Sequence, residues 1–191
     1  MDYFQLLGLP YFLAIDMSQL AAAFHSLSWR FHPDFYQNRS SQEQQISMAN
    51  AAFLNKAYRT LKDPNQRIAY LIGRVSGAVS IATEPPHDLF EEIFTLQETI
   101  ESFKAASANE QNDLARSLIE QQACFKKRFD REQEAIQTLA KAWDQLEANR
   151  EQDFTQDQKT CVQQMRQCLS HQGYLNRVLN DLSLVLGGTL S

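Results

Sequence analysis

The 191-residue sequence has little cysteine, glycine or proline, and no hydrophobic run long enough to span a membrane. It contains three cysteines, six glycines and five prolines, whereas alanine, leucine, glutamine and glutamate recur throughout. This composition predicts a helical protein. The net charge of −5 argues against a general nucleic-acid-binding protein, because such proteins present a basic surface. The first residues lack the features of a secretory signal, so we expect a cytoplasmic location and no membrane partner.

The three cysteines do not have the spacing of a metal site. Cys161 and Cys168 are seven positions apart, whereas zinc ligands come in pairs two to four residues apart. Free cysteine packs as a small apolar residue, so we interpret these two, and Cys124, as core residues. The four histidines include no i, i+4 pair typical of a helical metal site. We therefore expect neither a metal nor a cofactor.

Charge is distributed unevenly along the chain. Residues 1–75 hold seven basic and five acidic side chains, whereas the rest of the chain holds 11 and 18. The one stretch with the composition of a linker lies at 76–87, where Gly77, Pro85 and Pro86 occur. We therefore predict two domains, at 1–75 and 88–191.

Helical periodicity and capping signals predict four helices in the first domain, at about 2–7, 16–32, 42–62 and from 64 onward. Apolar residues recur at helical spacing in the second and third of these. They are Leu20, Phe24, Leu27 and Phe31 in one, and Ile46, Ala49, Phe53, Ala57, Tyr58 and Leu61 in the other. Two such stripes joined by a short polar loop predict an antiparallel helical hairpin.

Three longer helices are predicted in the second domain, at about 88–106, 109–149 and 156–186. The last contains two interleaved sevenfold series, which are Cys161, Cys168, Leu175 and Leu182, and Met165, Gln172, Leu179 and Leu186. This spacing predicts a coiled-coil-like bundle. We therefore expect an all-α protein with an N-terminal four-helix domain and a C-terminal three-helix bundle.

The tripeptide His32-Pro33-Asp34 separates the two helices of the predicted hairpin. Proline disfavours the helical conformation of the residue before it, so the helix should end at or near His32. An imidazole and a carboxylate are then presented to solvent at a helix–helix corner. These groups suit either binding or acid–base catalysis. No serine or cysteine nucleophile with a recognisable motif supports a hydrolase, which stays an alternative.

Three segments of the first domain together resemble a J-domain. They are Asp2-Tyr3-Phe4-Gln5-Leu6-Leu7-Gly8-Leu9, the stretch from Phe24 to His32-Pro33-Asp34, and Asn55-Lys56-Ala57-Tyr58-Arg59-Thr60-Leu61-Lys62-Asp63-Pro64. With Arg67, Ala69-Tyr70-Leu71-Ile72 and the following linker and bundle, the whole chain is similar to the HscB-like co-chaperones of iron–sulfur cluster assembly. The resemblance implies an L-shaped molecule in which the J-domain and the bundle share a small interface.

The resemblance also implies a chaperone-binding site. In J-domains the loop tripeptide contacts a DnaK-type chaperone, here an HscA-like one, and triggers its ATP hydrolysis. Asp34 would pair with a chaperone arginine. The preceding helix usually offers basic residues, so the implied site comprises His32, Pro33, Asp34, Arg30 and, as a second candidate on that helix, His25. Phe35 stands where lysine is commonest, which predicts a weaker electrostatic contribution to docking.

A second site is implied on the first bundle helix, which in HscB-like proteins offers an apolar and acidic face to the scaffold protein IscU. The matching positions are Phe90, Phe94 and Glu98. The two phenylalanines are alternatively core residues. Three positions depart from the family pattern, namely Glu91, Thr95 and Gln167, and these departures leave a different client open.

The form of this family in animal mitochondria carries a zinc-type Cys-x-x-Cys pair before the J-domain. No residues precede the J-domain in this sequence, so the expectation is the bacterial, cytoplasmic form. We expect an adaptor without an active site of its own, which holds the scaffold at one end and stimulates the chaperone at the other.

Overall fold

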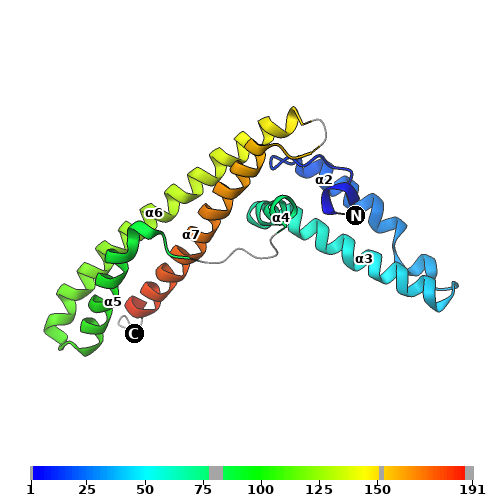
Figure 1. Ribbon diagram of the computed structural model, residues 1–191. Coiled ribbons are helices and arrows are strands. Elements are labelled where there is room, and N and C mark those ends of the chain that lie inside the picture. Colours follow the sequence, from blue (N-terminus) through cyan, green and yellow to red (C-terminus); the bar gives the residue numbers. More distant parts are fainter. Residues whose placement is uncertain (1, 78–83, 151–152, 188–191) are drawn as a thin grey trace. The chain divides into compact units, whose positions relative to one another are not determined.

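The computed structural model describes residues 2–77, 84–150 and 153–187, and its regular elements in these ranges are all helices (Figure 1). The all-α prediction is confirmed. The chain forms two compact units: unit 1 comprises Met1–Val79 and Leu139–Gln163, and unit 2 comprises Ser80–Thr138 and Gln164–Ser191. The units are defined by contacts in space and not by order along the chain. Each of the two long C-terminal helices therefore contributes residues to both units. The domain boundaries predicted at 76–87 stay a prediction, and 78–83 lie outside the described residues.

The N-terminal part of unit 1 contains the four helices predicted from the sequence. They are α1 (Tyr3–Leu6), α2 (Met17–Arg30), α3 (Ser41–Lys62) and α4 (Pro64–Ser76). Helix α2 ends two residues before the predicted end at His32, and His32 is extended with ψ of 129°, the conformation favoured before a proline. A short 3-10 helix, η1 (Pro33–Tyr36), lies within the predicted polar loop.

Side-chain caps fix where these helices begin. Asp16 accepts hydrogen bonds from two main-chain N–H groups at the start of α2, and Asp63 accepts one from Gln66 at the start of α4. At the start of α3, Ser40 and Glu43 form a reciprocal capping box. These contacts satisfy donors that have no partner within the helix, and the Ser40–Glu43 box lies at the end of the loop that carries η1.

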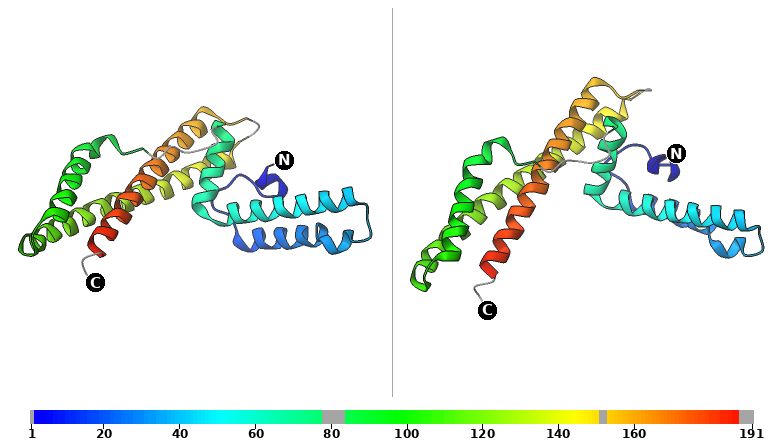
Figure 2. Two further views of the ribbon diagram at one scale, coloured as in Figure 1. Left: turned by 90° about the horizontal axis from the view of Figure 1, so that it is seen from below. Right: turned by 60° about the horizontal axis from the view of Figure 1, so that its bottom comes forward.

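The core of unit 1 lies between α1 and the antiparallel pair of α2 and α3, which run side by side in the views of Figure 2. Phe24 of α2 stacks on Tyr58 of α3, with ring centroids 4.2 Å apart. The buried face of α3 differs from the predicted stripe: Ile46 is 52% exposed, whereas Leu54 is buried. Ser47 occupies a buried position near Ile46 because its hydroxyl donates to the main-chain oxygen of Phe31 at 2.9 Å.

Two further predicted members of the α3 stripe, Ala49 and Phe53, are also exposed. The buried residues of this helix are instead Ser47, Leu54, Ala57 and Leu61. The apolar residues of α3 are numerous enough to fit two neighbouring stripes, and contact with α1 and α2 selects one of them. The prediction of a helical hairpin is correct, whereas its assignment of the first half of α3 to the core is wrong.

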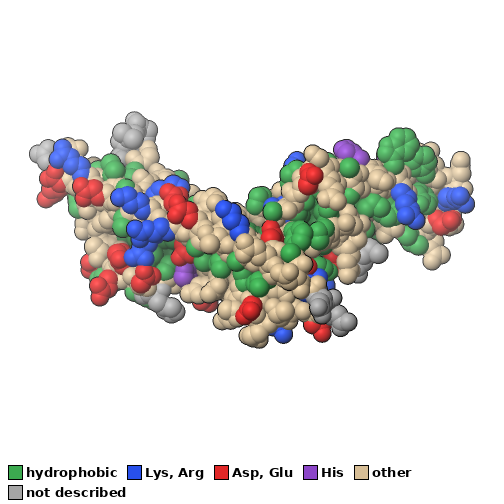
Figure 3. All heavy atoms as spheres, turned by 90° about the horizontal axis from the view of Figure 1, so that it is seen from above, with side chains coloured by type: hydrophobic (Ala, Val, Ile, Leu, Met, Phe, Trp, Pro, Cys, Tyr) green, Lys and Arg blue, Asp and Glu red, His purple; other side chains and the backbone are tan. Residues whose placement is uncertain are grey.

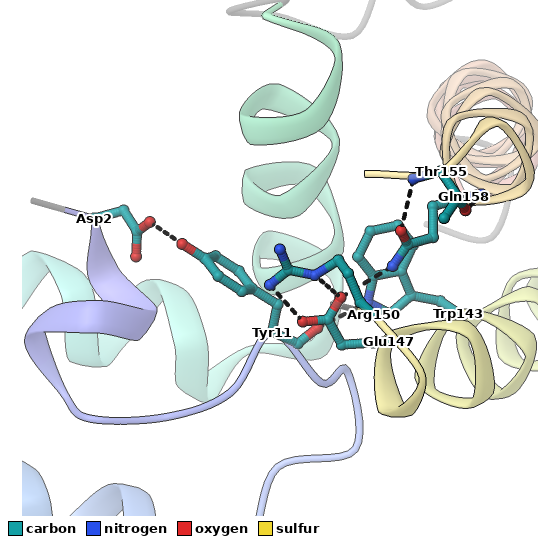
Figure 4. Close-up of polar contacts among 7 residues, drawn as sticks. All are labelled: Asp2, Tyr11, Trp143, Glu147, Arg150, Thr155 and Gln158. Carbon is teal, nitrogen blue, oxygen red and sulfur yellow. Dashed lines mark hydrogen bonds and ion pairs between the residues drawn. The ribbon is translucent and has the colours of Figure 1, made fainter. Parts of the chain in front are cut away.

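The turn between the two long helices α6 (Ala108–Ala148) and α7 (Gln156–Gly187) belongs to unit 1. Figure 4 shows its polar contacts. The carboxylate of Glu147 accepts two hydrogen bonds from Arg150, at 2.7 and 2.9 Å, and a third from the amide of Gln158 at 3.0 Å. The Arg150 guanidinium also lies over the ring of Tyr11, 5.3 Å from its centroid. The turn therefore packs against the segment between α1 and α2.

Unit 2 is a three-helix arrangement of α5 (Phe90–Ala105), preceded by the short η2 (His87–Leu89), with parts of α6 and α7. Its core comprises Leu89, Leu96, Phe103, Leu118, Phe125, Leu175 and Leu182. Leu175 and Leu182 belong to one predicted sevenfold series and Met165 to the other, and all three are fully buried. The periodicity of α7 is therefore confirmed. No helix within the described ranges is both long enough and apolar enough to cross a membrane.

The cysteines differ in their surroundings. Cys161 is buried and Cys168 half-buried, in agreement with the core interpretation, whereas Cys124 is exposed and the prediction for it is wrong. Cys124 lies on α6 one position before Phe125, and it is Phe125 that faces the core. Among the residues that the structure describes, no group of three or more potential ligands is placed to hold a metal ion.

Candidate functional site

The His32-Pro33-Asp34 tripeptide forms the corner between α2 and η1. His32 is the N-cap of η1, and its Nδ1 accepts a hydrogen bond from the main-chain N–H of Asp34 at 3.3 Å. Pro33 begins the 3-10 helix, where its fixed backbone suits the first position. The side chains of His32 and Asp34 are 54% and 69% exposed. Both groups are thus held in position by local structure while they stay accessible to a partner.

The carboxylate of Asp34 makes few contacts within the chain. Its Oδ1 accepts one long hydrogen bond from the amide of Gln37, at 3.3 Å, and its Oδ2 lies 3.5 Å from Nδ1 of His32. While Nδ1 accepts the main-chain N–H it carries no proton, so this approach is an ion pair only in the doubly protonated imidazolium, where Nδ1 no longer accepts that hydrogen bond. Most of the acceptor capacity of the carboxylate therefore faces solvent, where it can receive a guanidinium.

A surface hollow of about 590 Å³ lies beside the tripeptide. Its lining residues are His25, Ser28, Trp29, His32, Asp34 and Phe35. The first four recur at the i, i+3, i+4, i+7 spacing of one helix face, and the last two come from η1. The structure thus brings the predicted residues His25, His32 and Asp34 to one site. The predicted Arg30 is exposed at the end of α2 but does not line the hollow.

Sequence reasoning missed Trp29, which is 72% exposed. The signal that points to it is its spacing, because Trp29 lies four positions after His25 and three before His32. Phe35 was identified only as a departure from the usual lysine, and it is 57% exposed. The ring centroids of Trp29 and Phe35 lie 5.6 Å apart with their planes at 35°. The site therefore contains an exposed aromatic pair beside a carboxylate.

The hydrolase alternative would need a nucleophile within reach of the imidazole. Ser28 is the one hydroxyl that lines the hollow, and it lies four positions before His32. Within the described part of the chain, no hydrogen bond joins the Ser28 hydroxyl to His25 or His32. The arrangement therefore offers binding groups without the nucleophile–base contact that a serine hydrolase uses.

The predicted scaffold face lies on α5. Phe90 and Phe94 are 59% and 63% exposed, and Glu98 on the same helix face is also exposed. Leu96 and Phe103 supply the buried face of this helix, with Ile93 and Ile100 packed against them. The two phenylalanines are therefore surface residues, and the interpretation of them as core residues is wrong.

The three departures from the family pattern are exposed as well. Glu91 and Thr95 lie on α5, where the hydroxyl of Thr95 donates to the main-chain oxygen of Glu91 at 3.0 Å. Gln167 is exposed on α7. The altered positions are thus available to a partner, so they change the chemistry that this surface presents.

Comparisons with known proteins add to this geometry. No model of a known protein family matches the chain. The chain is 32% identical to co-chaperone protein HscB of Proteus mirabilis over 148 residues. This aligned region covers 75% of this chain and 83% of that protein. It is 37% identical to a co-chaperone HscB homolog of Vibrio cholerae over 110 residues. This aligned region covers 56% of this chain and 64% of the homolog.

The fold is similar to two solved structures. Chaperone HscB from Vibrio cholerae has a TM-score of 0.58 at 24% identity, with 98% of this chain and 99% of that chain covered. Human co-chaperone protein HscB has a TM-score of 0.53 at 19% identity, with 96% and 81% covered. These two likenesses concern the fold alone, whereas the Proteus mirabilis relative establishes the family. The chain therefore belongs to the HscB family of co-chaperones.

Proposed function

We propose that this protein is an adaptor for iron–sulfur cluster assembly. Its His32-Pro33-Asp34 corner docks on an HscA-like, DnaK-type chaperone and stimulates that chaperone's ATPase. Its α5 surface binds an IscU-like scaffold, and it has no active site of its own. The observation that carries the proposal is the Asp34 carboxylate, which is 69% exposed and accepts one long hydrogen bond from a side chain among the described residues. A carboxylate buried or fully paired within the chain would be unable to serve a partner.

The chemistry of the corner suits a switch. A carboxylate–guanidinium pair is directional and bidentate, so its formation favours one conformation of the partner over others. The 3-10 helix fixes the direction of Asp34, because Nδ1 of His32 accepts the N–H of the same residue. Docking therefore needs little ordering of the loop, which limits the entropy lost on binding.

The α5 surface suits a protein partner. Phe90 and Phe94 lie one turn apart and both rings are largely exposed, although the helix has other apolar residues for its core. Aromatic residues are enriched at protein–protein interfaces, and exposed apolar patches mark interaction sites. Holding chaperone and scaffold on one chain raises their effective concentration without any direct contact between them. In a bacterium this assembly would form in the cytoplasm.

The test is a steady-state ATPase assay of an HscA-like chaperone, with and without IscU and this protein. We expect this protein to raise the ATPase rate, and to raise it further when IscU is present. Stimulation of the chaperone without binding to IscU would favour the alternative of a different client. No stimulation under either condition would contradict the proposal. The full chain is the right reagent, because residues 139–163 pack with the N-terminal helices in unit 1.

A further inference from the structure

We propose that the hollow beside the tripeptide receives the arginine side chain of the chaperone that pairs with Asp34, and that Trp29 and Phe35 hold its guanidinium against their rings. This inference rests on the proposed function, and it names two residues and a contact that the tripeptide alone does not supply. The aromatic pair and the carboxylate line one hollow, so a single side chain can touch all three.

The geometry of the hollow combines aromatic faces with a negative charge. Trp29 comes from α2, whereas Phe35 and Asp34 come from η1. The ring of Phe35 lies at 35° to that of Trp29 and at 77° to that of His32, with centroid separations of 5.6 and 6.2 Å. Three rings thus surround the space next to the carboxylate. A planar cation fits such a space because it can stack on a ring while its N–H groups reach the carboxylate.

Charge complementarity selects the occupant. The six lining residues include one acidic residue and neither lysine nor arginine. An aliphatic side chain in the hollow would take the Asp34 carboxylate out of water without a partner, which costs free energy, and an anion would be repelled by it. Arginine presents five donors and a flat, weakly hydrated guanidinium that stacks on aromatic rings. An arginine side chain therefore suits both the carboxylate and the aromatic rings that line the hollow.

Helix α2 carries few basic side chains. Arg30 is the one arginine or lysine in this helix, with His25 as the second candidate, although the resemblance leads us to expect more basic residues. Figure 3 shows hydrophobic side chains beside a histidine on the part of the surface that contains the α2–α3 hairpin. Docking by short-range stacking depends little on ionic strength, whereas docking by a row of lysines weakens as salt screens the attraction. We therefore expect affinity for the chaperone to fall less than threefold between 50 and 300 mM salt.

The experiment compares Trp29→Leu, which keeps apolar bulk, with Trp29→Phe, which keeps a ring. Calorimetry with the ATP-bound chaperone should show that Trp29→Leu weakens binding about five- to thirtyfold, whereas Trp29→Phe weakens it less than threefold. The matched control is Leu184→Ala, because Leu184 is 75% exposed on α7 in unit 2 and should leave the affinity unchanged. Equal affinities of Trp29→Leu and the native protein would overturn the inference.

Two further measurements separate this inference from its alternatives. If Asp34→Asn still stimulates the chaperone ATPase, the proposed function itself is contradicted. If Asp34→Asn loses that stimulation but Trp29→Leu binds the chaperone with undiminished affinity, only the aromatic contact is overturned. Sedimentation of the free protein tests whether a second copy covers the hollow. A native dimer that becomes a monomer in Trp29→Leu would overturn the inference, and an unchanged mass would support it.

Discussion

The indole Nε1 of Trp143 donates a 2.7 Å hydrogen bond to the main-chain oxygen of Tyr11, which lies 132 positions earlier in the chain. The next residue, Asp144, accepts hydrogen bonds from the main-chain N–H groups of Leu13 and Ala14, at 2.5 and 2.8 Å. The end of α6 therefore satisfies three main-chain groups in the segment between α1 and α2. This segment has no regular structure of its own, so its conformation depends on these contacts.

The first prediction concerns this hydrogen bond. Trp143→Phe removes the indole donor and leaves the oxygen of Tyr11 without its partner in a part-buried position. We expect the free energy of unfolding to fall by about 1–3 kcal/mol, measured by urea denaturation. The matched control is Trp29→Phe, which affects the other tryptophan of the chain at a largely exposed position and should change stability by less than about 0.5 kcal/mol. Equal effects of the two substitutions would show that the Trp143 contact contributes little.

These contacts mark the limit of what the sequence predicts. Local signals such as the Asp16 cap and the Pro64 start predict the helices of unit 1 to within two residues, because they act within one turn of the chain. The Trp143–Tyr11 bond joins segments more than a hundred residues apart, and no periodicity reports it. From the sequence alone, Trp143 is one more apolar residue of the helix predicted at about 109–149.

In the candidate site, too, the features set by local sequence could be predicted, whereas those set by longer-range packing could not. Exposure of His32 and Asp34 follows from the effect of Pro33 on His32, and the structure agrees with that expectation. The hollow could not be predicted, because it depends on how η1 folds back beside α2 and places Phe35 next to Trp29. From the sequence, residues 33–42 are predicted to form a loop. A loop prediction does not say in which direction the side chains point.

The second prediction concerns the cysteines. Burial raises the pKa of the Cys168 thiol to about 12, with a further contribution from the neighbouring Glu132 carboxylate, and burial also raises the pKa of Cys161. Both thiols are therefore protonated at pH 8, and the thiolate is the reactive species. With a thiol reagent such as DTNB at pH 8 we expect one rapid equivalent, from the exposed Cys124, and two more only in denaturant.

Cys124→Ser is the control for this assignment, because it should remove the rapid equivalent and leave the slow ones. Two rapid equivalents in the native protein would mean that α7 opens readily in solution.

The third prediction tests the α5 surface. Phe90→Ser combined with Phe94→Ser should weaken binding to IscU about tenfold or more in a pull-down or calorimetric titration, because interface aromatics dominate binding energies. Since both rings are mostly exposed, the free energy of unfolding should change by about 1 kcal/mol or less. In contrast, Phe103→Ala on the buried face of the same helix should cost about 3–5 kcal/mol.

A large loss of stability in the Phe90→Ser, Phe94→Ser variant would show that the rings pack in solution against part of the protein itself. Unchanged affinity for IscU in a stable variant would instead favour a different client for this surface.

The central claim is that the exposed Asp34 carboxylate activates a second protein, and Asp34→Asn tests it most directly. The measurement is the steady-state ATPase rate of an HscA-like chaperone with native protein, Asp34→Asn, or the control Gln37→Ala, which removes the amide that donates a hydrogen bond to this carboxylate. We predict that Asp34→Asn leaves the chaperone at its basal rate while its own unfolding free energy stays within about 0.5 kcal/mol of native, and that Gln37→Ala stimulates normally. Full stimulation by a folded Asp34→Asn protein would contradict the account.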